Sequence, residues 1–227
     1  MKPIVINLTL IIPTKLEAES LPIFLDELKK YDCNKLIVLQ KEDHETINSI
    51  KKVNDLEILV QKNNGYGNAL IEGIESVTTE YCCIINADGS MDPKYLNEML
   101  DVCVNNDLVF TSRYQKPDGG SDDDDLVTFV GNKFFSALGN IFFNLKISDI
   151  LYTYILGKTE SFKKLDLKNY DFRICVELPI KAKRMNMKYI TLPSYERSRI
   201  GGKKKVNAIK DGFFILSEMI RLFYKKK

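Results

Sequence analysis

The chain has no tryptophan and only one histidine, His44, among its 227 residues. One imidazole cannot build a metal centre by itself, and the five cysteines show no metal-like spacing. Two of them, Cys82 and Cys83, are adjacent inside an apolar run. We therefore interpret the cysteines as buried, reduced thiols, which fits a cytosolic compartment.

Long apolar runs and a strong net charge are missing as well. No stretch approaches the ~18 apolar residues of a membrane span, and the nearest, residues 134–145, is too short and contains Gly139 and Asn140. The formal net charge of +2 gives no reason to expect a nucleic-acid partner. The N-terminal apolar stretch runs straight into Pro13 without a small-residue cleavage site, so we predict a buried strand there and not a signal peptide.

Short apolar runs alternate with amphipathic segments along the first half of the chain. We predict strands at residues 4–12, 36–39, 56–60, 81–85 and 108–112, and helices at 16–30, 46–53, 68–77 and 93–104. This alternation is typical of an α/β fold with a mainly parallel sheet and helices on both faces. Ligands bind beyond the carboxyl ends of such strands, so the residues just after each strand are the first candidates for a site.

The second half of the sequence has a different pattern. An acidic loop at residues 118–125 precedes a very apolar helical stretch at 126–145. We predict strands at residues 151–156 and 189–192, a helix near 173–185, and a last helix at 207–224 whose apolar residues form one stripe. We expect a single domain over residues 1–227, whose two halves meet near residue 115.

The most informative motif follows the fourth predicted strand, at residues 86–93 (NADGSMDP). A carboxylate at a strand end before a tight glycine turn suits Mg²⁺ or Mn²⁺, which take oxygen ligands and bridge to phosphates. Asp88 is the candidate ligand. The alternative is a plain Asp-Gly turn, and Asp92 caps the helix that Pro93 begins in either case.

Three further segments carry candidate ligand-binding groups. Gly65 and Gly67 (residues 63–69, NNGYGNA) let backbone amides approach an anion, and Ala69 and Gly73 allow close packing of a helix on the sheet. Glu17, in the PTKLE segment at residues 13–17, can accept hydrogen bonds from a base or ribose. The loop at residues 196–205 (ERSRIGGKKK) is a candidate phosphate clamp. Ordinary turns, a first-turn helix acid and a solvated basic loop are the alternatives.

Taken in order, these motifs resemble family 2 glycosyltransferases, and most of all the dolichyl- or undecaprenyl-phosphate sugar transferases. The resemblance rests on residues 13–17, 65–70 (GYGNAL), 86–90, 111–114 (TSRY), 131–132 (GN), 148–149 (SD) and 199–205. It implies a GT-A fold with a nucleotide-sugar-binding half at residues 1–115 and an acceptor half at 116–227 that carries the C-terminal helix. It also implies an inverting displacement at the anomeric carbon.

The resemblance also implies roles for individual residues. Donor-binding residues would be Pro13, Thr14, Glu17, Gly65, Gly67, Asp88 and Arg113. Asp88 would hold the Mg²⁺ or Mn²⁺. Arg113, Arg199 and Lys205 would bind phosphates, and Asp149 would lie near the acceptor. Asp88, Asp149 and Arg199 would form the catalytic set. Asn86 stands where the family has its first metal-motif acid, which keeps a weakly active or non-catalytic partner subunit as an alternative.

The absence of one family motif indicates which kind of acceptor the chain uses. Branches of the family that use a hydroxyl acceptor usually carry a Gln-x-x-Arg-Trp motif, and this chain has no tryptophan. A lipid phosphate is already ionised and needs only positive clamps, so we predict transfer of a hexose from a UDP- or GDP-sugar to a polyprenyl phosphate. Transfer to a glycan hydroxyl during polysaccharide assembly is the alternative.

The apolar stripes beside a lysine tail predict peripheral contact with the cytoplasmic face of a membrane. Packing of the same stripes on the sheet, or contacts between copies of the chain, are the alternatives.

Overall fold

The computed structural model describes residues 7–202 and 205–225. Its main sheet contains seven strands, and two very short strands form a separate ladder. The strands are β1 (Leu8–Thr14), β2 (Asn34–Leu39), β3 (Glu57–Val60), β4 (Tyr81–Ile84), β5 (Leu108–Ser112), β6 (Gly120–Ser121), β7 (Ile155–Lys158), β8 (Tyr189–Pro193) and β9 (Tyr195–Glu196).

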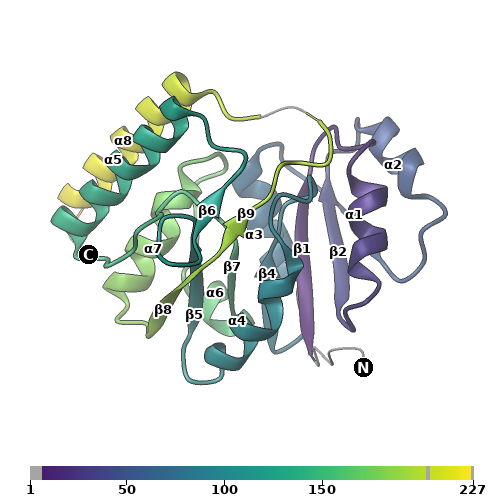
Figure 1. The fold of residues 1–227 in the computed structure, drawn as a ribbon, viewed down its shortest axis with the longest axis horizontal. Helices are drawn as coiled ribbons and strands as arrows, with labels where there is room; N and C mark the ends of the chain where they lie inside the picture. The colour runs from purple at the N-terminus through teal and green to yellow at the C-terminus, as the bar shows by residue number, and fades with distance from the viewer. Residues whose placement is uncertain (1–6, 203–204, 226–227) are drawn as a thin grey trace.

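Helices connect the strands, as Figure 1 shows. They are α1 (Leu21–Leu28), α2 (His44–Ile50), α3 (Tyr66–Ser76), the 3₁₀ turn η1 (Pro93–Tyr95), α4 (Leu96–Cys103), α5 (Leu126–Phe143), α6 (Thr159–Lys164), α7 (Ile174–Arg184) and α8 (Ala208–Tyr224). Side-chain caps fix several helix starts: Asp43 accepts from the amide of Thr46, and Asp125 from that of Thr128. Asp92 caps η1 directly before Pro93, which confirms that prediction.

The main sheet has the order β3-β2-β1-β4-β7-β5-β8 and is parallel except for β7. β7 pairs antiparallel with both β4 and β5. Strands from both halves of the sequence therefore share one sheet. The carboxyl ends of β1, β2 and β4 meet at the same edge, which is where the fold can build a site.

The two faces of the sheet carry separate apolar cores, because successive strand residues point to opposite faces. Along β1, Ile11 joins the core beneath α3, α6 and α7, whereas Leu10 and Ile12 join the core beneath α1, α2 and α4. A Cβ on Gly73 would lie 2.6 Å from Cγ2 of Ile11, so this glycine lets α3 approach the sheet as predicted.

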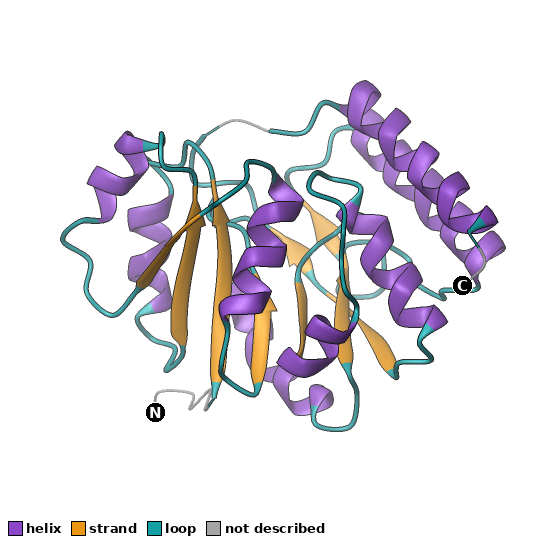
Figure 2. Cartoon of the chain, turned by 180° about the vertical axis from the view of Figure 1, so that it is seen from behind, coloured by secondary structure: helices purple, strands orange, loops and turns teal. Residues whose placement is uncertain are grey.

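The pair α5 and α8 stands apart from the sheet. Both views show these helices side by side at one end of the molecule (Figures 1 and 2). α8 packs mainly on α5 and α7. Its buried residues Ile215, Met219 and Leu222 join the apolar core on the α3 face of the sheet. The expectation of a C-terminal amphipathic helix is confirmed.

Two predictions about the second half need correction. The strand expected at residues 151–156 lies at Ile155–Lys158 and runs antiparallel to its neighbours. We also expected no stretch that could span a membrane, yet α5 is long and apolar enough by length and composition alone. A single helix of that kind is by itself weak evidence for a span. Its buried residues are Asn132, Phe135, Ser136 and Gly139.

Candidate active site

The turn after β1 brings Glu17 to the carboxyl edge of the sheet. Pro13 and Thr14, which we expected just beyond this strand, are its last two residues, and the Thr14 hydroxyl donates to the Ile12 carbonyl. Leu16 then adopts a left-handed conformation with φ 53°. Its amide donates to Asp43 over 2.6 Å, so the cap of α2 also holds this turn in place.

The Glu17 carboxylate is almost fully buried and already paired. It accepts a hydrogen bond from the Ser20 hydroxyl at 2.6 Å and lies 3.1 Å from the Lys205 ammonium group. The structure therefore brings two predicted ligand-binding residues into direct contact, although they are 188 positions apart in the chain.

Asp88 lies at the end of β4 in the tight turn that the sequence predicts. Oδ1 accepts hydrogen bonds from the Ser90 amide at 3.0 Å and from its hydroxyl at 2.8 Å. Oδ2 lies 3.7 Å from the Arg199 guanidinium. One oxygen of this carboxylate is thus fixed by the turn, and the other faces the Arg199 guanidinium instead of a second carboxylate.

The loop at residues 196–202 is seated directly on this turn. The Arg197 amide donates to the Ser90 carbonyl and the Ile200 amide to the Asp88 carbonyl, each at 2.8 Å. Gly89 has φ 75°, and a Cβ there would lie 2.4 Å from the Ile200 side chain. This close contact places the predicted phosphate clamp over the predicted metal ligand.

Arg199 carries a second partner that the sequence did not reveal. Its guanidinium grips Asp123 through two hydrogen bonds, at 3.1 Å and 2.7 Å. The acidic run at residues 122–125, which we had treated as a loop on the acceptor side, therefore contributes to this site. Arg199 bridges the acidic loop and Asp88.

Arg113 is buried in a cage of three carboxylates. Its guanidinium binds both oxygens of Asp149, at 2.7 Å and 2.9 Å, and also reaches Glu196 at 3.1 Å and Asp124 at 3.2 Å. The ring of Tyr152 lies 4.5 Å from it. Burial raises the pKa of the Glu196 carboxyl even though Arg113 lowers it. One cation thus balances three acids, and the cluster carries excess negative charge.

A known sequence family matches most of this chain. The model of glycosyl transferase family 2 matches residues 9–166, well over half of the chain. The chain belongs to this family. It is a nucleotide-sugar-dependent glycosyltransferase with a GT-A fold.

Solved structures share the fold at low sequence identity. Glucosyl-3-phosphoglycerate synthase from Mycobacterium tuberculosis, in complex with Mn²⁺, UDP and glucosyl-3-phosphoglycerate, superposes with a TM-score of 0.74 at 9% identity, covering 97% of this chain and 81% of that one. Mannosyl-3-phosphoglycerate synthase from Rubrobacter xylanophilus gives a TM-score of 0.67 at 14% identity, covering 95% and 72%. At these identities the likeness concerns the fold.

This family 2 glycosyltransferase has few protein ligands for a divalent cation near the β4 turn. Within the described ranges, no group of three or more His, Cys, Asp or Glu side chains gathers as a metal site. Asn86 offers a neutral amide, whose oxygen accepts from the Tyr66 hydroxyl at 3.4 Å. Mg²⁺ needs one or two carboxylates when phosphates and water complete its shell. Asp88 can therefore serve as the single carboxylate ligand of such a metal ion.

The glycine segment has a contact that we did not predict. Gly65, with φ 130°, begins α3, and a Cβ there would lie 2.1 Å from the Tyr170 carbonyl oxygen. A Cβ on Gly67 would lie 2.1 Å from the Asn169 carbonyl oxygen. These glycines therefore admit the backbone of residues 169–171, and an approach of the donor to the same segment stays a prediction.

A pair of glycine substitutions tests this packing. We expect Gly67→Ala to lower the free energy of unfolding by more than 1 kcal/mol, roughly the range found for overpacking, because the new methyl group meets rigid backbone. The control is Gly131→Ala in α5, where a Cβ meets nothing within 4 Å. This change should stabilise by roughly 0.5–1 kcal/mol, since alanine costs less in a helix. Equal urea midpoints for both variants would contradict the packing.

Four residues of the site were missed by sequence reasoning: Asp123, Asp124, Tyr152 and Glu196. Glu196 stood inside the basic loop that we examined, but its partner Arg113 is 83 positions away. The acidic run was visible as four consecutive acids, and only its target was not. Lys203 and Lys204 of the predicted clamp lie outside the described residues.

Proposed function

We propose that this glycosyltransferase moves a hexose, with inversion, from a UDP- or GDP-sugar to a polyprenyl phosphate at the cytoplasmic face of a membrane. The resemblance to the dolichyl- and undecaprenyl-phosphate branch supports the acceptor. The observation that carries the proposal is the exposed apolar surface of α5 and α8, which belongs to the half of the chain predicted to bind the acceptor.

We call this surface the α5–α8 face. It consists of large apolar side chains that are at least two-fifths exposed, namely Leu126, Val127, Phe129, Val130, Phe134, Ile141, Phe142, Ile209, Phe213, Phe214, Ile220, Phe223 and Tyr224. Many large apolar side chains exposed on two neighbouring helices are typical of a membrane or protein contact. A helix pair lying flat on a lipid surface would bury these side chains.

The opposite side of α8 is fixed to the protein body. Ile215, Met219 and Leu222 are buried. Glu218 is also buried, accepts a hydrogen bond from the Asn169 amide at 2.9 Å, and binds Arg221. The helix therefore has one anchored side and one open side, which is the arrangement that a peripheral membrane contact requires.

The charged groups of the site suggest how the donor is bound. In the described structure Lys205 pairs with Glu17, and Arg199 pairs with Asp123 and Asp88. A nucleotide diphosphate offers both cations an alternative partner, because the Arg199 guanidinium can grip two phosphate oxygens and the Lys205 ammonium group binds phosphate as a point charge. Glu17 is then free to accept hydrogen bonds from the nucleoside. A divalent cation on Asp88, when bound, would neutralise the charge on the leaving diphosphate.

Incubation with labelled nucleotide sugars and competing acceptors tests the proposal. We expect labelled lipid product with polyprenyl phosphate and UDP- or GDP-hexose, and little product with glycans or 3-phosphoglycerate. Product with a glycan alone, or with 3-phosphoglycerate alone, would contradict the lipid acceptor while leaving the family assignment intact. Metal-dependent nucleotide binding without transfer to any acceptor would favour a non-catalytic partner subunit.

A glycan hydroxyl is the second candidate acceptor, and the cage around Arg113 favours it. Asp149, Glu196 and Asp124 surround one guanidinium, and this excess negative charge repels an acceptor phosphate. A hydroxyl nucleophile needs a carboxylate base, and Glu196, with its raised pKa, is within this cluster. The same competition experiment separates the two candidates.

The α5–α8 face gives a prediction for membrane binding. Ile209 and Phe213 are 86% and 72% exposed. The double variant Ile209→Glu/Phe213→Glu should weaken binding to anionic vesicles at least about 100-fold, since burial of each side chain contributes roughly 1.5–3 kcal/mol. Vesicle cosedimentation measures the effect, and the melting temperature should not change.

The control for this prediction places the same charges elsewhere. Ile23→Glu/Val104→Glu alters two apolar side chains that are also more than half exposed, at 58% and 59%, and that lie in α1 and directly after α4. It should bind vesicles as the wild type does. Equal binding by both double variants would contradict the membrane contact, and a dimer lost only in Ile209→Glu/Phe213→Glu would assign the face to self-association.

A further inference from the structure

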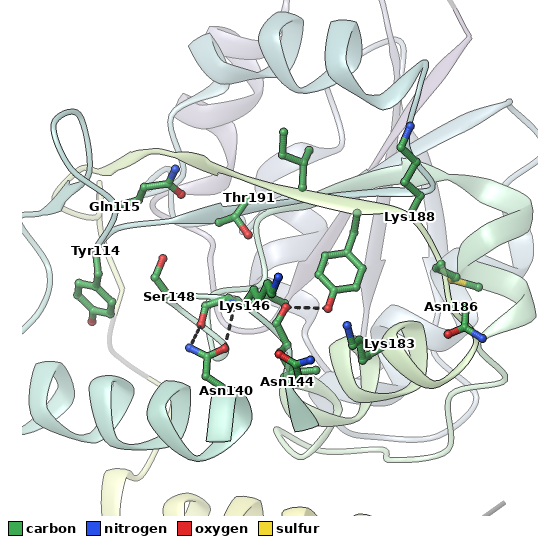
Figure 3. Close-up of a pocket in the computed structure, with 15 residues that line it drawn as sticks. Tyr114, Gln115, Asn140, Asn144, Lys146, Ser148, Lys183, Asn186, Lys188 and Thr191 are labelled. Carbon is green, nitrogen blue, oxygen red and sulfur yellow. Dashed lines mark hydrogen bonds between the residues drawn. The ribbon is translucent and has the colours of Figure 1, made fainter. Parts of the chain in front are cut away.

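A cavity of about 920 Å³ lies outside the strand-end site. Its lining comes from the free edge of β8, from the loop at residues 144–148, and from the ends of α5 and α7. In Figure 3, Tyr114 and Gln115 lie at one end of the cavity and Lys188 and Asn186 at the other. None of the predicted donor-binding or metal-binding residues lines it.

The charge of the lining has one sign. Three lysines contribute to it, Lys146, Lys183 and Lys188, and no aspartate or glutamate does. Among residues 7–202 and 205–225, none of these lysines has an ion pair with a carboxylate. Lys183 sits in the last turn of α7, where a helix terminus attracts a cation, but Lys146 and Lys188 lie outside helices.

The remaining polar groups make the wall rigid. Asn140 uses its amide on the backbone of Ile147, at 2.9 Å and 3.0 Å, and the Tyr189 hydroxyl donates to the Leu145 carbonyl at 2.7 Å (Figure 3). These bonds hold the loop at residues 144–148 against β8. Apolar side chains of Met187 and Ile190 complete the lining. The cavity therefore combines fixed walls, apolar surface and ammonium groups without counter-charges.

We infer that this cavity binds a phosphate group attached to a partly apolar molecule, through Lys146, Lys183 and Lys188. Lysine ammonium groups bind phosphate as point charges, and three of them around one cavity without a carboxylate favour an anion over a cation. The phosphate belongs either to a soluble phosphomonoester or to a lipid headgroup. The inference does not depend on the proposed acceptor, because no residue of the strand-end site takes part.

The cavity also borders the cage around Arg113. Tyr114 and Ser148 line it, and they directly follow Arg113 and precede Asp149 in the chain. The hydroxyls of Ser148 and Ser112 are 2.6 Å apart. A ligand in the cavity therefore contacts the segments that carry the Arg113–Asp149 pair.

Phenyl phosphate and inorganic phosphate are suitable probes, titrated at low salt into ¹⁵N-labelled protein. We expect shifts in the amide signals of residues 145–148 and 188–191, and tighter binding of phenyl phosphate because its ring contacts the apolar lining. The triple variant Lys146→Gln/Lys183→Gln/Lys188→Gln should weaken binding at least tenfold. The control Lys41→Gln/Lys51→Gln/Lys52→Gln makes the same change in net charge at three exposed lysines near α2 and should bind as the wild type does.

The result would overturn the inference if both triple variants bound phenyl phosphate equally, or if the shifted amides were those around Asp88 and Arg199. The variant Asp88→Asn should bind the probe normally, which separates this cavity from the donor site. Vesicles with and without phosphatidylglycerol distinguish the two sources: a lipid headgroup is indicated if phosphatidylglycerol vesicles displace phenyl phosphate, and a soluble ligand if they do not.

Discussion

Replacement of Asp88 by alanine is expected to lower turnover about 1000-fold, because Lewis-acid stabilisation of a leaving group supplies several kcal/mol and each ~1.36 kcal/mol is a factor of ten in rate. Oδ2 of Asp88 is held by no backbone or hydroxyl donor and lies 3.7 Å from the Arg199 guanidinium, so it is the oxygen that a metal ion would use. The fold should survive, since the Asp88 carbonyl still accepts from the Ile200 amide. Steady-state transfer of labelled sugar measures the effect.

Asp92 provides the matched control, four residues further along the same loop. Its carboxylate caps η1 by accepting from the Lys94 amide at 3.0 Å. Asp92→Ala should cost about 1 kcal/mol of stability, as lost helix caps typically do, and leave turnover within a few fold of the wild type. Wild-type turnover in Asp88→Ala, or an equal loss in both variants, would refute the assignment of Asp88 as the metal ligand.

Replacement of Arg113 by methionine should lower the free energy of unfolding by about 3–5 kcal/mol, the cost found when one partner of a buried ion pair is removed. The variant leaves Asp149, Glu196 and Asp124 close together in a buried site without their cation. Urea denaturation followed by circular dichroism measures the change. Arg113→Lys should recover only part of it, because an ammonium group cannot grip both oxygens of Asp149.

The control for Arg113 is Arg173→Met. Arg173 also grips both oxygens of an aspartate, Asp171, but this pair is partly exposed, at 23% and 31% of the two side chains. Its loss should cost about 1 kcal/mol or less. If Arg113→Met melted normally and instead lost affinity for nucleotide diphosphate, the guanidinium would serve the phosphate-binding role that the family resemblance implies, and not the structural role that its cage indicates.

Much of the fold could be predicted because its signals are local. The alternation of short apolar runs with amphipathic helices identified β1 to β5 and the helices between them, and Gly73 pointed to close packing on the sheet. The antiparallel strand β7 could not be read in this way. Its insertion between β4 and β5 depends on pairing over about 50–75 positions, and nothing in residues 151–158 encodes direction.

In the candidate site, too, residues with local sequence signals could be predicted and those brought in by long-range contacts could not. Asp88 and Glu17 were found because strand ends and tight turns have sequence signatures. Asp123 and Glu196 were missed, since they reach Arg199 and Arg113 from distant segments. Lys205 was expected in the site, but its pairing with Glu17 was not. The roles expected for Gly65, Gly67 and Arg113 rest on motif resemblance, and the structure adds backbone contacts and a carboxylate cage that the motifs do not express.

Calorimetric titration of nucleoside diphosphates tests the central claim most directly, since donor binding through Asp88 and a divalent cation underlies every other step. We predict that UDP or GDP binds in the presence of Mn²⁺, that binding weakens at least tenfold when the metal is chelated, and that Asp88→Ala removes the metal effect while Asp92→Ala retains it. Absence of binding by any nucleoside diphosphate, or equal binding with and without Mn²⁺, would contradict the account.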